Sequence, residues 1–211
     1  MRKSCASGSV EKRILYLRYL RDIQKEIFRK TIHLCTVLVP FLLNRLYVFT
    51  LVALCLVLII YIIAEILRMH GRSVPVLTTI TMVAARKRDE TKIVWGPITL
   101  CIGVIVTAIV FKNNPQAFSM GILSLACGDG VASVVGKIFG KTPSPFGIAK
   151  TVEGSIACFI AIFFVGFFYL DSTISALILA TIGMIVEMFP TKDFDNILIP
   201  IIIAFFVEFL F

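Results

Sequence analysis

Long apolar segments recur along this chain, and they limit what it can fold into. A helix that crosses the hydrocarbon core of a bilayer needs about twenty mostly apolar residues, and seven segments come near this requirement. They cover residues 32–46, 47–67, 93–111, 116–140, 152–170, 173–189 and 197–211. Hydrophobic residues make up 58% of the chain, against roughly 45–50% in a soluble domain, and the mean hydropathy is +0.96. We therefore predict an all-α integral membrane protein with about seven transmembrane helices.

Two of the candidate spans are less regular than the others. The first is short and meets the second abruptly at Asn44-Arg45, as in a tight helical hairpin, and the fourth is only moderately apolar. Ahead of them, residues 11–29 predict a basic amphipathic helix on the membrane surface. We divide the chain into this interfacial segment, 1–31, and one polytopic membrane domain, 32–211. The first thirty residues are too charged for a cleavable signal peptide, so none is expected.

The charge of the chain, formally +8, would favour a nucleic-acid partner in a soluble protein. In a membrane protein it has another explanation, because Lys and Arg gather on the cytoplasmic side of the spans. With a cytoplasmic N-terminus, every Lys and Arg except Arg45 and Lys112 falls on that side. We predict this orientation, in the plasma or inner membrane of a prokaryote or the endoplasmic reticulum of a eukaryote, and no nucleic-acid partner. The six cysteines lack metal-type spacing and predict no disulfide framework.

The same orientation places nearly all the polar residues at span ends on the cytoplasmic side. The opposite side holds little besides Asp171 and Glu208. A channel or transporter would be expected to carry polar groups along its whole depth. This distribution favours an enzyme that acts at the cytoplasmic interface.

The fourth span carries the most informative residues. Ser124, Gly128, Ala132, Gly136 and Gly140 recur every four residues and predict a ridge of small side chains for close helix packing. On the neighbouring ridge lie Asp129, Ser133 and Lys137. An aspartate at membrane depth usually marks a function. The alternatives are that Asp129 and Lys137 form a structural ion pair, or that the glycines serve packing alone.

A second motif, Lys150-Thr151-Val152-Glu153-Gly154-Ser155, begins the fifth span. The free amides of a helix N-terminus together with a lysine predict an anion site. Glu153 could complete a Mg²⁺ site with Asp129. The alternative is that Thr151 caps the helix and Lys150 anchors the chain at the interface.

Two weaker clusters flank these motifs. Glu26, Arg29, Lys30 and His33 share one helical face where the chain enters the membrane, although such a cluster is often an anchor. Glu187 ends the sixth span, and Asp193, Asp195 and Asn196 precede the seventh, where Asp195 or Asn196 could be an ordinary helix cap.

Together, these residues resemble the polyprenol kinase family of membrane proteins, which includes dolichol kinase, phytol kinase and CTP-dependent diacylglycerol kinases. The matching elements run in family order: Glu26-x-x-Arg29-Lys30-x-x-His33, Glu65-x-x-Arg68, Gly128-Asp129-Gly130-Val131-Ala132-Ser133-x-x-Gly136-Lys137-x-x-Gly140, Lys150-Thr151-x-Glu153-Gly154-Ser155, and Glu187-x-x-Pro190 followed by Asp195-Asn196. Phytol kinase-like members often have an aspartate where this chain has Ser133. The serine favours a polyprenol, dolichol or diacylglycerol acceptor over phytol.

The resemblance implies transfer of the γ-phosphoryl group of CTP to the terminal hydroxyl of a lipid alcohol, with Mg²⁺ as the cofactor. It implies that Asp129, Lys150 and Glu153 are catalytic, with Asp129 and Glu153 as metal ligands; Asp129 could instead accept the proton of the hydroxyl. The implied nucleotide- and phosphate-binding residues are Arg29, Lys30, His33, Gly128, Gly130, Ser133, Lys137, Thr151 and Gly154. The implied supporting residues are Glu65, Arg68, Glu187, Asp195 and Asn196.

Two other functions compete with this one. A CTP:phosphatidate cytidylyltransferase looks similar in its central motifs, but the C-terminal part of this chain has no His-Gly-Gly or Asp-Arg-x-Asp stretch. A small membrane transporter or scaffold is favoured only if no nucleotide binds. The sequence alone does not identify the lipid or the oligomeric state.

Overall fold

The computed structural model describes residues 3–72, 74–84, 92–191 and 193–210. It is all-α apart from one small hairpin, with 84% of its residues in helices. In chain order the elements are α1 (Lys3–Leu34), η1 (Cys35–Val37), α2 (Leu38–Arg45), α3 (Tyr47–Met69), α4 (Pro75–Ala84), α5 (Trp95–Val110), α6 (Pro115–Ser124), the π-helical turn η3 (Leu125–Asp129), α7 (Gly130–Phe139), β1 (Pro143–Ser144), β2 (Gly147–Thr151), α8 (Val152–Tyr169), α9 (Thr173–Met188) and α10 (Asp195–Leu210).

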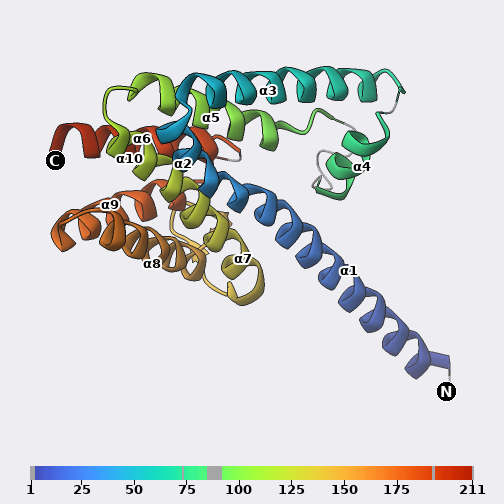
Figure 1. Cartoon of the computed structure of the whole chain (residues 1–211). Coiled ribbons are helices and arrows are strands. Elements are labelled where there is room, and N and C mark those ends of the chain that lie inside the picture. The colour runs from blue at the N-terminus through green and yellow to red at the C-terminus, as the bar shows by residue number, and fades with distance from the viewer. Residues whose placement is uncertain (1–2, 73, 85–91, 192, 211) are drawn as a thin grey trace.

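The centre of the molecule is one nearly continuous helical segment made of α6, η3 and α7. Figure 1 shows α1 entering from one corner to meet this segment, with α8 and α9 side by side on one flank and α3 along the opposite edge. In the most apolar part of the segment 72% of the residues are buried inside the protein. Other helices therefore cover it, which explains why the fourth predicted span needs fewer apolar residues than a helix that faces lipid.

Within the described residues, three helical segments are long and apolar enough to cross a membrane, namely α3, the segment 115–139 and α8. The shorter helices α5 and α9 are also apolar. All seven predicted spans fall on helical structure in the described residues, which confirms the all-α fold class and is consistent with a membrane protein. The number of helices that cross the bilayer stays a prediction.

The structure differs from the sequence prediction at the N-terminal side. The first predicted span is not one helix, because it consists of the end of α1, the turn η1 and the short helix α2. At Leu46 the backbone leaves helical geometry, with φ −137° and ψ 58°, and α3 begins at the next residue. The predicted surface helix is the middle of α1, which continues unbroken past residue 31 into the body of the protein. The segments 1–31 and 32–211 are thus joined by one continuous helix.

The ridge of small residues packs helices closely, as the sequence predicts. A Cβ atom added at Gly128 would lie 2.9 Å from side-chain atoms of Ile162 in α8, and one added at Gly154 would lie 2.8 Å from the carbonyl oxygen of Ala132 in α7. The same holds between α5 and α10, where a Cβ at Gly103 would lie 2.1 Å from the carbonyl oxygen of Asn196. These contacts bring α8 close to η3 and α7, and α10 close to α5.

Candidate functional site

The first part of the candidate site is the buried carboxylate of Asp129, which is 1% exposed. It ends the π-helical turn η3, a geometry often found at functional sites because it interrupts the regular ladder of helical hydrogen bonds. The ammonium of Lys30, from α1, donates a hydrogen bond to Asp129 Oδ2. Lys30 is itself only 7% exposed, so the two residues form a buried ion pair across 99 positions of sequence.

His33 supports the same turn from one helical turn further along α1. Its Nε2 lies 3.2 Å from the carbonyl oxygen of Leu125 and 3.6 Å from Asp129 Oδ2. A carbonyl oxygen only accepts hydrogen bonds, so Nε2 carries the proton and donates a hydrogen bond to the carbonyl oxygen of Leu125. His33 therefore links α1 to the first residue of η3 and, through it, fixes where Asp129 lies.

The second part of the site is a buried network around Lys150. The Lys150 ammonium lies 3.0 Å from Glu187 Oε1 and 2.9 Å from Asp195 Oδ2. The other oxygen of Glu187 accepts a hydrogen bond of 2.7 Å from the Ser155 hydroxyl. Both carboxylates are buried, Glu187 at 2% and Asp195 at 6% exposure. The network thus joins β2, α8, α9 and the start of α10.

The β-hairpin holds Lys150 in place against the end of α9. β1 and β2 pair antiparallel, and the Ser144 hydroxyl donates to the carbonyl oxygen of Met188 at 3.0 Å. The rings of Phe146 and Phe189 stack with centroids 4.4 Å apart. The hairpin thereby positions the Lys150 ammonium beside the Glu187 and Asp195 carboxylates.

The charged groups in the two parts of the site interact electrostatically with one another. Burial by itself lowers the pKa of the Lys150 ammonium, but Asp195, Asp129 and Glu187 outweigh this effect and raise the pKa above its ordinary value. Lys150 is therefore fully protonated at neutral pH. Three buried carboxylates face the buried ammonium of Lys30 and the partly buried ammonium of Lys150, so this set of five residues carries one negative charge in excess.

Groups of the protein itself accept hydrogen bonds from backbone amides at the N-terminus of α8. The Thr151 side chain accepts a hydrogen bond from the Gly154 amide at 3.2 Å, which is an ordinary helix cap. The Val152 amide donates to the carbonyl oxygen of Thr142 at 2.9 Å. The Glu153 carboxylate accepts from the Thr142 amide at 3.1 Å. The predicted Thr151 cap is therefore confirmed, whereas Lys150 as a membrane anchor stays a prediction. The described contacts do not bring Glu153 to Asp129.

The glycines of the central motif differ in their surroundings. Gly128 and Gly154 lie in helix–helix contacts, as described above, whereas a Cβ added at Gly130 would meet no atom within 4 Å. Gly130 is nevertheless buried and directly follows Asp129. Open space therefore lies beside the backbone of Gly130, one residue after Asp129. Ser133 reaches Asp129 Oδ1 only at 3.5 Å.

Lys137 shows that the predicted structural ion pair does not form. Its side chain is exposed near the end of α7, and the described partner of Asp129 is Lys30. The pairing with Lys30 escaped the sequence analysis because the two residues lie far apart in the chain. The available signal was the unusual position of Lys30 and His33 on one face where α1 enters the apolar region.

The remaining predicted residues stabilise the surroundings of the site. Glu65 accepts hydrogen bonds from Arg68 and from the Val94 amide, the latter at 2.7 Å, and so fixes the chain before α5. The Asn196 side chain donates to Thr99 Oγ1 at 3.0 Å and ties α10 to α5. Arg29 pairs with Glu26 on the same helix.

The chain resembles several known proteins along part or most of its length. It is 28% identical over 191 residues to the uncharacterized protein MJ1137 of Methanocaldococcus jannaschii, which covers 87% of this chain and 93% of that protein. It is 25% identical over 158 residues to phytol kinase 1, chloroplastic, of Arabidopsis thaliana, covering 66% and 52% of the two chains. It is 30% identical over 111 residues to the phytol kinase of Synechocystis, covering 48% of each.

No family model and no solved structure matches the chain. The aligned part spans about half the length of these two phytol kinases. The protein is therefore a distant homologue of proteins named phytol kinase.

Proposed function

We propose that this protein is a membrane lipid kinase that transfers the γ-phosphoryl group of CTP to the terminal hydroxyl of a lipid alcohol at the cytoplasmic face. The observation that carries the proposal is the buried Asp129 carboxylate, which Lys30 and His33 contact through Oδ2. The homology to phytol kinases supports the reaction class. The acceptor we propose is a prenol-type alcohol, such as a polyprenol or dolichol, with diacylglycerol as the alternative.

Asp129 is arranged to receive the proton of the acceptor hydroxyl. Lys30 and His33 both approach Oδ2, whereas Oδ1 has only the long contact from Ser133. Oδ1 is therefore the oxygen left for a ligand. A carboxylate oxygen within hydrogen-bond reach of the hydroxyl can accept its proton. Positioning of this kind accounts for much of the catalysis in phosphoryl transfer, since the reaction needs little covalent chemistry from the protein.

The donor set fits Mg²⁺ bound together with a nucleotide. Among the described residues, no three His, Cys, Asp or Glu side chains are grouped as a preformed metal site. Mg²⁺ usually takes only one or two carboxylates and completes its shell with phosphates and water. The excess negative charge of the buried cluster favours a cation over a bare phosphate. We propose Asp129 as a ligand of this ion, as the alternative to its role as proton acceptor, whereas Glu153, the predicted second ligand, is engaged by the Thr142 amide. The ion would neutralise charge on the phosphates.

Lys30 and Lys150 are the cations we assign to the phosphate groups. Each is held by carboxylates in a fixed position. An ammonium group carries three hydrogen atoms, so each lysine keeps at least one that it can donate to a phosphate oxygen. The exposed Lys137 and the paired Arg29 lie at the edge of this region, where they can contribute charge.

The direct test of the function is analysis of products. The purified protein would be incubated with Mg²⁺, each of the four nucleoside triphosphates and a panel of prenols and diacylglycerol. We expect a lipid monophosphate and a nucleoside diphosphate in equal amounts, with CTP as the best donor. Pyrophosphate with a CDP-lipid would identify a cytidylyltransferase instead, and no turnover with any donor would reject an enzyme of this class.

The first prediction concerns Lys150. Lys150→Ala should raise the KM for the nucleotide about tenfold or more, because a hydrogen bond between charged groups is lost. Lys150→Arg should restore the affinity only in part, since a planar guanidinium replaces a compact ammonium. Melting in detergent should show how much of the loss comes from the unpaired Glu187 and Asp195. The control is Lys12→Ala in the exposed part of α1. An equal rise in the KM for the nucleotide in this variant would show that Lys150 serves only as a membrane anchor.

The second prediction concerns His33. His33→Ala should lower kcat about tenfold with little change in the KM for the nucleotide, because Nε2 is occupied by the Leu125 carbonyl and serves to position η3. His33→Gln supplies an amide donor in a similar place and should restore part of kcat. A large rise in KM without rescue by Gln would show that His33 binds the nucleotide directly.

A further inference from the structure

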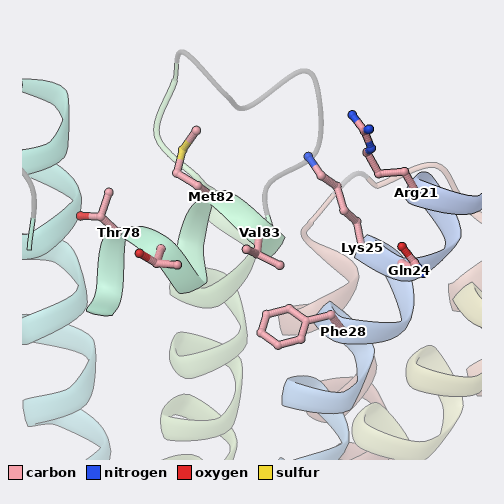
Figure 2. A pocket seen from close by; sticks show the side chains of 8 residues that line it. Arg21, Gln24, Lys25, Phe28, Thr78, Met82 and Val83 are labelled. Atoms are coloured by element: carbon pink, nitrogen blue, oxygen red, sulfur yellow. The ribbon is translucent and has the colours of Figure 1, made fainter. Parts of the chain in front are cut away.

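A groove of about 720 Å³ lies between α1 and α4, away from the site described above. Its lining includes Arg21, Lys25 and Phe28 from α1 and Thr79, Met82 and Val83 from α4. Figure 2 shows Phe28 and Val83 facing each other across the groove, with the Arg21 and Lys25 side chains at its rim. We propose that this groove binds one anionic phospholipid of the surrounding bilayer through its headgroup phosphate.

The chemistry of the lining fits both ends of such a lipid. Arg21 can donate two parallel hydrogen bonds to a phosphate, and Lys25 adds a second positive charge. Phe28, Met82 and Val83 remain 38%, 39% and 43% exposed although they line a concave surface. Exposed apolar side chains below a cationic rim provide a surface for an acyl chain below its headgroup. A zwitterionic lipid would gain less from the rim, because its own ammonium opposes the two basic residues.

The position of the groove points to the bilayer as the source of the ligand. α4 follows the end of α3, and Arg68 at that end lies 3.9 Å from the sulfur of Met82. In the predicted orientation this is the cytoplasmic end of α3, at the depth of the headgroups. The anionic lipids of a membrane gather in this leaflet and attract basic residues near its surface.

The groove lies on the opposite face of α1 from the candidate catalytic site. The helical period of 3.6 residues places Arg21, Lys25 and Phe28 on one face, and Lys30 and His33 on the other. A lipid in the groove would therefore not be the acceptor beside Asp129. It would hold α1 against α4, while the opposite face of α1 carries Lys30 and His33 to Asp129. The inference concerns a separate lipid site and does not depend on kinase activity.

The test measures binding of single lipids to the intact protein by native mass spectrometry in detergent. Phosphatidylglycerol and phosphatidylcholine with identical acyl chains are the probes, and we expect tighter binding of phosphatidylglycerol. Arg21→Gln with Lys25→Gln should weaken its binding about 25-fold, since each basic residue near an anionic lipid contributes roughly a fivefold factor. Val83→Trp, which fills the groove without changing charge, should weaken the binding of both lipids.

The matched control is Lys12→Gln with Arg13→Gln, which removes the same charge from α1 outside the groove. This variant should keep the preference of the wild type within about twofold. Thermal melting of each variant checks that it is folded. Equal losses in the control and the groove variant, or no preference for phosphatidylglycerol in the wild type, would overturn the proposal and leave only general attraction between α1 and acidic membranes.

Discussion

The buried charge of Asp129 is the constraint on which the rest of the structure depends. Removing a carboxylate from water costs several kcal/mol unless an opposite charge and hydrogen bonds compensate for it. In this protein the compensation comes from Lys30 and His33, which lie on a different helix far away in the sequence. α1 must therefore enter the body of the protein and pack against η3 and α7. The longest helix of the fold is held at its inner end by a pair of polar contacts.

A second polar network repeats this arrangement on the other side of the central segment. Lys150 is carried by a short hairpin, and its two acids come from the end of α9 and the start of α10. Each network joins elements that apolar packing alone would leave free to slide past one another. α8 packs closely against η3 at Gly128 and against α7 at Gly154. This packing brings the two networks near enough for Asp129 to raise the pKa of Lys150. The fold thus concentrates its buried charges in one region.

Hydrophobic patterning predicted where most of the helices lie, because each of the seven apolar segments falls on helical structure. It did not predict α4, whose ten residues are too few for a span and lie in what looked like a loop. The residue types of the site were also predictable, since an aspartate among glycines at membrane depth is rare. Its partners were not, because the pairing of Asp129 with Lys30 depends on the packing of α1. The role of Glu153 could not be judged without the position of the Thr142 amide.

The most direct test of this account is a double-mutant cycle on Lys30 and Asp129, measured by both stability and turnover. Lys30→Met leaves a buried carboxylate without its partner and should destabilise the protein by about 3–5 kcal/mol. Asp129→Asn should remove turnover, and the combination with Lys30→Met should recover most of the lost stability while the protein remains inactive. A Lys30→Met protein as stable and active as the wild type would contradict the account, as would an Asp129→Asn protein that retains normal turnover.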